Sequence, residues 1–112
     1  MNIVLADIEG NLISAWNDIA SNNSNITTYQ GSIFEVECDA LVSPANSFGF
    51  MDGSLDFAIS EFFGWHVQDR LQEIIKSKHS GELLVGQAEG VPTDHASIPY
   101  VIYAPTMRVP MD

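Results

Sequence analysis

An asparagine, two glycines and an aspartate lie close together in the middle of the chain. Asn46 ends an apolar run, Gly49 and Gly53 lie in the loop behind it, and Asp56 follows the start of a new helical pattern at Ser54. A strand that ends at a polar amide, followed by a glycine-bearing loop and a helix N-terminus, is typical of an anion-binding site. We expect the main-chain N–H groups around Gly49 and Gly53 to hold a phosphate-bearing small molecule.

The charge of the chain limits the partners that it can bind. Its 112 residues include 15 acidic and 4 basic side chains, which gives a formal net charge of -11. Non-specific nucleic-acid binding needs Lys and Arg to displace counterions, and anionic membranes attract basic segments. We therefore expect neither non-specific nucleic-acid binding nor membrane binding. An anion site made of main-chain amides needs no arginine, so an acidic chain can still hold a phosphate.

Short apolar runs alternate with helical patterns along the sequence. We expect strands at 1–8, 26–30, 40–42 and 100–104 and a further strand that starts at 83–85, with a helical turn at 33–37 and a loop at 91–95. A first helix is expected after its cap at Asn11, a second opens at Ser54 and is broken at Gly64, and a last helix ends at 79–81. This alternation predicts an α/β fold with a largely parallel sheet. Ligands of such sheets lie beyond the carboxyl ends of the strands, where Asn46 and the residues after Pro105 should meet.

Several motifs resemble those of the macro domain family. The family pattern is a G-D-I turn, then V-D-A-I-V-N-A-A-N, a glycine-rich loop and V-D-x-A-I. This chain has G-S-I at 31–33, C-D-A-L-V-S-P-A-N at 38–46, D-G-S at 52–54 and L-D-F-A-I at 55–59. Its G-E-L-L-V-G at 81–86 and Y-V-I-Y-A-P at 100–105 are similar to later family segments. The resemblance implies a three-layer α/β/α sandwich with a mixed, largely parallel sheet.

The resemblance also implies a ligand and a set of site residues. Macro domains recognise ADP-ribose, and some members hydrolyse ADP-ribosyl linkages. The expected partner is therefore ADP-ribose, a related nucleoside diphosphate sugar or an ADP-ribosylated macromolecule, and no cofactor or metal is implied. For an ADP-ribosyl hydrolase of the ADP-ribosylglycohydrolase type, the catalytic candidates are Asn46 and Asp56. The ligand-binding candidates are Ser32, Ile33, Ala45, Asn46, Gly49, Gly53, Ser54 and Leu55.

Each candidate also has a purely structural interpretation. Asn46 could be a turn residue, which is a common role for asparagine after a strand. Asp56 could be a first-turn acid whose pKa is lowered by the helix dipole, which would weaken it as a base. Ser32 replaces the family aspartate that recognises adenine, so it offers a hydrogen bond without charge. Pro44 removes one backbone donor from the motif.

Two other functions fit these departures from the family pattern. In the first, the chain is a non-catalytic interaction module of macro fold that has lost nucleotide binding. In the second, it is a proton-transfer enzyme that acts on another phosphorylated metabolite. Binding of ADP-ribose separates the first alternative from the main hypothesis, and release of ADP-ribose from a modified substrate separates a hydrolase from a binder.

The length of the chain fits one domain over 1–112. Macro domains continue past the Y-V-I-H strand with a further helix, more strands and a second glycine-rich loop. We therefore expect this domain to lack the C-terminal part of the family. A sheet that ended at the strand 100–104 would have an open edge, and open edges favour pairing with another chain. Self-association through that edge is the corresponding prediction.

We interpret the cysteine as a structural residue, and we expect the protein to be cytoplasmic. Cys38 is the single cysteine and lies between two acids, so it forms no internal disulfide and its thiolate is disfavoured. No signal peptide and no apolar run of membrane-spanning length is recognisable, which favours a reducing cytoplasm. His66, His79 and His95 lack the spacing of a zinc site.

Overall fold

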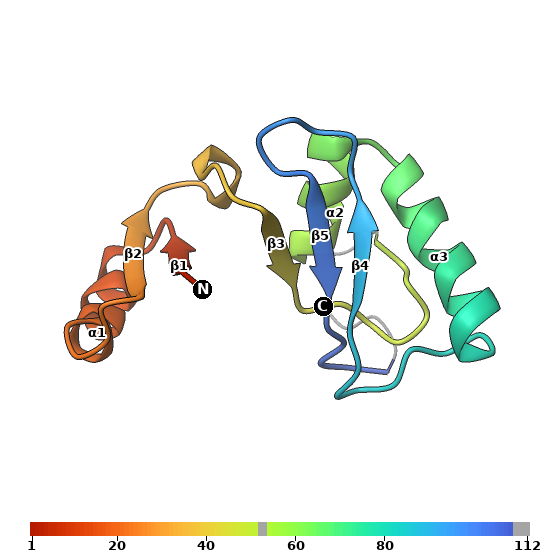
Figure 1. The fold of residues 1–112 in the computed structure, drawn as a ribbon, viewed down its shortest axis with the longest axis horizontal. Coiled ribbons are helices and arrows are strands. Elements are labelled where there is room, and N and C mark those ends of the chain that lie inside the picture. Colours follow the sequence, from red (N-terminus) through yellow and green to blue (C-terminus); the bar gives the residue numbers. More distant parts are fainter. Residues whose placement is uncertain (52–53, 109–112) are drawn as a thin grey trace. The chain divides into compact units, whose positions relative to one another are not determined.

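The structure is a computed structural model that describes residues 1–51 and 54–108. The chain divides into two compact units, Met1–Glu37 and Cys38–Asp112, and each is described here by itself (Figure 1). The expected α/β class is confirmed, because strands and helices alternate as the sequence predicts. The strand pairings of the described residues are mixed, with parallel pairs in both units and an antiparallel pair in the second.

The first unit is a β-α-β arrangement. Strand β1 (Ile3–Asp7) pairs in parallel with β2 (Ile26–Gln30), and helix α1 (Gly10–Ala20) connects them. The sequence predicted that Asn11 caps this helix, but Glu9 is the cap. Its carboxylate accepts a hydrogen bond from the N–H of Asn11 at 3.2 Å. An acid at a helix N-terminus meets unpaired N–H groups there, which is why Glu9 can replace the expected cap.

The second unit contains a three-stranded sheet in the order β3-β5-β4. Strand β3 (Ala40–Ser43) runs parallel to β5 (Tyr100–Tyr103), and β4 (Glu89–Pro92) runs antiparallel to β5. Helix α2 (Ser54–Phe63) lies behind β5, and α3 (His66–His79) contacts both α2 and β4 (Figure 1). The strand at 100–104 was expected at the edge of the sheet, but β5 lies in its middle. Among the described residues of the second unit taken by itself, the edge strands of this sheet are therefore β3 and β4.

The prediction of a strand at 83–85 is wrong. Leu83 is fully buried, but its main chain is not paired with any of the named strands. The N–H of Leu83 donates instead to the carbonyl of Ser47 at 2.7 Å. The strand begins later, at Glu89, and extends into the residues 91–92 that were expected in a loop. Burial under a loop gives the same apolar signal in the sequence as burial in a sheet, so the pattern alone placed the strand too early.

Glycines define the ends of the helices where the sequence predicted them. Gly64 has φ +104 and separates α2 from α3. At the end of α3, Ser80 and Gly81 both adopt positive φ, and the N–H of Gly81 donates to the carbonyl of Ile75 at 3.0 Å. Left-handed residues of this kind close a helix by bonding its last carbonyl groups. Among the described residues, no helix has the length and apolar character needed to cross a bilayer.

Candidate ligand site

Asn46 organises the loop that follows β3. Its side chain is almost fully buried, with a relative exposure of 4%. The side-chain oxygen accepts hydrogen bonds from the N–H groups of Phe48 at 3.1 Å and Phe50 at 3.2 Å. The side-chain nitrogen donates to the carbonyl of Phe50 at 2.6 Å. Asn46 therefore closes the turn 46–50 through both ends of its amide, in agreement with its structural interpretation, and its contact with a ligand stays a prediction.

Gly49 lies against α3 and has a backbone shape that favours glycine. Its φ is +74, and an added Cβ would lie 3.0 Å from a methyl carbon of Ile75. The N–H of Gly49 donates to the carbonyl of Asn46 at 3.4 Å, so it is not free for a ligand in this conformation. This differs from the expectation of open amides, because the tight turn brings the donor back to its own loop. Gly53 lies outside the described residues.

Two glutamines of α3 bond the main chain of the same loop. The side-chain oxygen of Gln68 accepts a hydrogen bond from the N–H of Met51 at 2.8 Å. The side-chain nitrogen of Gln72 donates to the carbonyl of Gly49 at 3.3 Å. Sequence reasoning missed both residues. Their spacing of four positions on one helix places them on the same face, and this was the available signal.

Met51 anchors the end of the loop in the core. Its side chain is fully buried, and its sulfur accepts a hydrogen bond from the hydroxyl of Tyr103 at 2.9 Å. Its carbonyl accepts a further bond from the hydroxyl of Ser60 at 3.0 Å. The loop is thereby tied to α2 through Ser60 and to β5 through Tyr103, in addition to its bond with α3.

Asp56 is buried in the first turn of α2, where Ser43 of β3 donates to it. The hydroxyl of Ser43 lies 2.5 Å from a carboxylate oxygen of Asp56, and both residues are buried. Burial raises the pKa of Asp56, while the bond from Ser43 opposes the increase. This direction differs from the lowering of the pKa expected at a helix N-terminus, because desolvation is the largest cause of the shift. A carboxylate with a raised pKa is a better base than a solvated one.

Tyr103 is the second acidic group near this position. Burial raises its pKa, and the negative charge of Asp56 adds to the increase. The phenol therefore keeps its proton at neutral pH and acts as the hydrogen-bond donor to Met51. Ser43, Asp56 and Tyr103 are thus buried polar residues that are connected by the Ser43–Asp56 hydrogen bond and by the strand pairing of Ser43 with Tyr103. Ser43 lies only three positions before Asn46.

The chain that follows β5 runs beside the loop, as the fold class predicts. The N–H of Ser47 donates to the carbonyl groups of Met107 at 3.1 Å and Arg108 at 3.2 Å. The guanidinium of Arg108 lies 5.4 Å from the centre of the Phe48 ring and donates to Glu82 at 2.7 Å. Arg108 is a cation beside the loop that sequence reasoning missed, because only the folded chain brings its segment to residues 46–48.

Two ligand candidates, Ser32 and Ile33, belong to the first unit. The hydroxyl of Ser32 accepts a hydrogen bond from the N–H of Phe34 at 3.3 Å, and its own N–H donates to the carboxylate of Glu35 at 2.8 Å. These bonds cap the short helix η1 (Ile33–Glu35), which confirms the helical turn expected there. Because each unit is described by itself, a role of Ser32 and Ile33 at the ligand stays a prediction.

The other candidates lie in the second unit beside Asn46 and Asp56. Ala45 is buried, and its carbonyl accepts a hydrogen bond from the N–H of Thr106 at 3.0 Å. Ser54 is the first residue of α2, and Leu55 follows it with a partly exposed side chain. Their contact with a ligand also stays a prediction.

The residues that the structure describes include no cluster of metal ligands. In the described part of the chain, no three side chains of His, Cys, Asp or Glu lie together in a way that could hold a metal ion. Burial raises the pKa of Cys38, and the charge of Asp39 adds to the increase, so the thiol is favoured over the thiolate.

Comparisons with known proteins place these features in one family. The profile of the Macro domain family matches residues 42–112. An uncharacterised protein of Aquifex aeolicus (strain VF5) is 33% identical over 86 residues, which cover 77% of this chain and 48% of that protein. Among solved structures, the macrodomain of Mycobacterium tuberculosis DarG superposes with a TM-score of 0.61 at 20% identity, covering 72% of this chain and 51% of the other. The chain thus spans about half the length of both relatives.

Proposed function

Because this chain belongs to the macro domain family, we propose that it binds ADP-ribose or a related nucleoside diphosphate sugar at the loop after β3. The observation that carries the proposal is the convergence of two main-chain donors. The N–H groups of Phe48 and Phe50 meet one oxygen of Asn46 at 3.1 and 3.2 Å. A phosphate oxygen in the same position would accept both bonds, and charge would strengthen them.

The proposal requires an exchange of hydrogen bonds at Asn46. In the free loop, the Asn46 oxygen accepts both donors. A ligand oxygen would replace it, and the freed asparagine amide could then bond a ribose hydroxyl, since an amide both donates and accepts. Arg108 beside Phe48 would add a positive charge to an otherwise acidic chain. The affinity would therefore come from few contacts, and the exchange would reduce it.

Hydrolysis of an ADP-ribosyl linkage is a second step of the same proposal. Asp56 has a raised pKa because it is buried, and it accepts a hydrogen bond from Ser43. As a base, Asp56 would accept a proton from an attacking water while Asn46 orients the sugar. The water oxygen would form a bond to the linked ribose carbon as the bond from that carbon to the acceptor breaks, and the acceptor would leave with a proton taken from solvent. For this whole process we propose a cytoplasmic location, since the single Cys38 fits a reducing compartment.

A non-catalytic interaction module is the alternative, and one observation favours it. Within the described loop, the consecutive N–H groups of residues 47–51 all donate to acceptors of the protein. A loop that satisfies its own donors gains less from an anion than a loop with open donors. This module would share the fold of the family and bind a macromolecule through another surface.

Calorimetric titration with ADP-ribose, ADP and ribose phosphate tests the proposal. We expect heat of binding for ADP-ribose and a weaker response for the two fragments, because each of them offers only part of the contacts. Absence of heat for all three ligands would contradict nucleotide binding and favour the interaction module. Release of ADP-ribose from a modified protein substrate, and its loss in Asn46→Ala, would support hydrolysis. Binding without release would leave the chain a binder.

A further inference from the structure

We propose that Gln68 and Gln72 are positioning residues that hold the loop 46–51 in register on α3 so that its other polar groups can face a ligand. The consequence for the ligand rests on the function proposed above. The two glutamines bond the loop at separate points, Met51 N–H at 2.8 Å and Gly49 carbonyl at 3.3 Å. They leave Phe48 and Phe50, whose N–H groups meet Asn46, for the exchange with a ligand.

The chemistry of the partners fixes the orientation of each glutamine amide. A main-chain N–H can only donate, so Gln68 must present its oxygen to Met51. A main-chain carbonyl can only accept, so Gln72 must present its nitrogen to Gly49. The two residues are four positions apart on one helix and therefore lie one above the other. The same side chain thus serves as an acceptor at one position and as a donor at the next turn.

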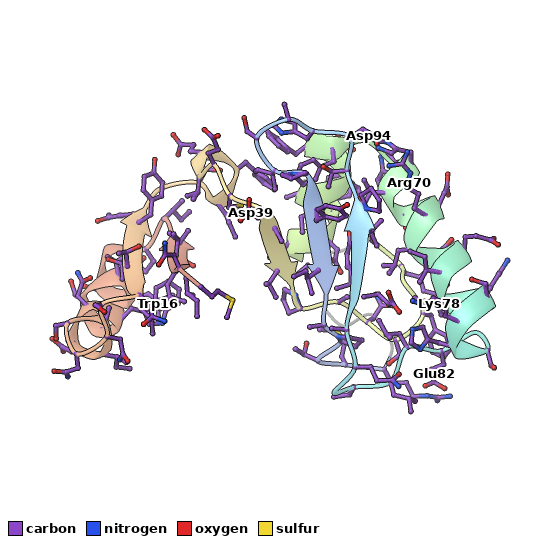
Figure 2. All side chains as sticks on the ribbon, in the orientation of Figure 1. Trp16, Asp39, Arg70, Lys78, Glu82 and Asp94 are labelled. Atoms are coloured by element: carbon purple, nitrogen blue, oxygen red, sulfur yellow. The ribbon has the colours of Figure 1, made fainter. Side chains whose placement is uncertain are left out.

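Helix α3 is a firm base for this contact, because β4 and the chain after it hold both of its ends. Near the first turn, Arg70 donates to the carbonyl of Pro92 at 2.8 Å and to the carboxylate of Asp94 at 2.7 Å. In the last turn, His79 and Lys78 lie 2.8 and 3.3 Å from one carboxylate oxygen of Glu89. Figure 2 shows Arg70 and Asp94 close together and Lys78 toward the other end of the helix.

The inner face of α3 also fixes the distance between helix and loop. Leu71 and Ile75 are buried, and both would lie within 3.2 Å of a Cβ added at Gly49. The main chain at Gly49 is therefore packed directly on the helix, where the Gln72 amide can reach its carbonyl. Apolar packing sets the separation, and the two glutamines set the position of the loop along the helix.

One substitution made at both positions distinguishes positioning from a general effect of charge. In Gln68→Glu, a carboxylate oxygen can still accept the bond from Met51, and its charge strengthens the bond. In Gln72→Glu, the carboxylate has no donor for the carbonyl of Gly49 and repels it. Both variants add one negative charge, one turn apart on the same helix. Glu73→Gln is the control for a change of one unit of charge, here of the opposite sign, because Glu73 is exposed on this helix and none of its described hydrogen bonds reaches the loop.

The experiment combines ligand affinity with hydrogen exchange at the loop. For Gln68→Glu and Glu73→Gln we expect a Kd for ADP-ribose within about threefold of wild type. For Gln72→Glu we expect binding weaker by about tenfold, which is the typical effect of one lost hydrogen bond with its partner left unpaired. The melting temperatures of the two glutamate variants should agree within a few degrees. Gln68→Ala should speed exchange of the Met51 amide about tenfold, and Gln68→Glu should not.

The two readouts separate failure of this inference from failure of the proposed function. If wild type binds none of the nucleotides, the function proposal fails, and exchange at Met51 still decides whether Gln68 holds the loop. Equal affinities of the two glutamate variants would overturn the inference. Unchanged exchange at Met51 in Gln68→Ala would overturn it as well, because the bond would then contribute nothing to the loop.

Discussion

The loop after β3 contains Asn46, and the first turn of α2 contains Asp56. The two residues belong to the same sequence motif, but their polar side chains have different surroundings. In the loop, Asn46 uses both ends of its amide to bond Phe48 and Phe50. In α2, Asp56 is a buried carboxylate that accepts a bond from Ser43, and no cation pairs with it among the described residues. The first arrangement stabilises a turn, whereas the second retains a charge at a cost in hydration. A buried carboxylate that has lost hydration without gaining a cation is a stronger indication of function than a satisfied turn. Asp56 is therefore the stronger functional candidate of the two.

Removal of the Asn46 side chain should have the largest effect. Asn46→Ala deletes three hydrogen bonds and leaves two N–H groups and one carbonyl of the loop without partners. We expect a loss of about 3 kcal/mol in the free energy of unfolding, since each unpaired group costs about 1–3 kcal/mol unless water replaces the partner. Urea unfolding measures the loss. Asn46→Asp is the matched control, because its carboxylate keeps both N–H contacts. An equal loss in the two variants would contradict the role of the Asn46 oxygen.

Neutralisation of Asp56 should change the pH dependence of stability. Because the pKa of Asp56 is raised, the folded protein holds this proton more tightly than the unfolded chain does. The contribution of Asp56 is therefore full in acid, below its unfolded pKa, and is lost as the pH rises through the folded pKa. Relative to wild type, Asp56→Asn should gain stability as the pH rises toward neutrality, as denaturant unfolding at a series of pH values would show. A constant difference across the series would contradict the raised pKa.

Asp56→Asn also tests whether the first turn of α2 contributes to ligand binding. If Asp56 bonds a sugar hydroxyl, Asp56→Asn should weaken ADP-ribose binding by at least about tenfold, the typical effect of a hydrogen bond to a charged group. Ser43→Ala is the control, because it removes the bond to Asp56 and retains the carboxylate. Unchanged affinity in Asp56→Asn would contradict a role of Asp56 in ligand binding.

Arg108 should make a smaller, salt-dependent contribution. It is exposed, with 70% of its side chain accessible, and it lies beside the ring of Phe48. Arg108→Ala should weaken ADP-ribose binding several-fold in low salt and less at high ionic strength, because exposed charges are screened. Lys76→Ala is the matched control, since it removes the same charge from an exposed position on α3. Equal effects of the two variants would mean that net charge alone matters.

Substitutions at the sheet edges should have the smallest effect on stability. Their expected effect is on self-association of the chain. Edge strand β4 ends in Pro92, which has no N–H to donate to another strand, whereas β3 exposes 58% of Val42 and carries no charge. Self-association should therefore use β3, and Val42→Lys should reduce it in size-exclusion chromatography with light scattering. Val85→Lys is the control, because Val85 is equally exposed outside the strands. A monomeric wild type would contradict this prediction.

The sequence predicted those parts of the fold that local patterns determine. The β-branched run at Ile26–Gln30 and the apolar run beginning at Ala40 are strands, and Gly64 ends α2, because these signals lie within the elements themselves. The run at 83–85 was misleading, since it is buried beneath a loop without entering a ladder. The prediction of one domain over 1–112 stays a prediction.

The site was predictable in position but not in bonding. The motif placed Asn46 after β3 and Asp56 in the first turn of α2, where the structure has them. Gln68 and Gln72 reach the loop from 17 and 23 positions away. Their spacing indicates a shared helix face, but one sequence does not show which segment that face contacts. The sequence also does not show where the main-chain N–H groups of the loop point. Whether they face a ligand or Asn46 depends on how tightly the turn closes.

Titration of the isotope-labelled protein with ADP-ribose, followed through the main-chain amide resonances, tests most directly whether the loop 46–51 binds the diphosphate. We expect large, saturable shifts at Phe48 and Phe50, as their N–H groups exchange the Asn46 oxygen for a phosphate oxygen, and small shifts at Met51, whose N–H donates to Gln68. Saturable shifts confined to other parts of the chain, or none at all, would contradict this expectation.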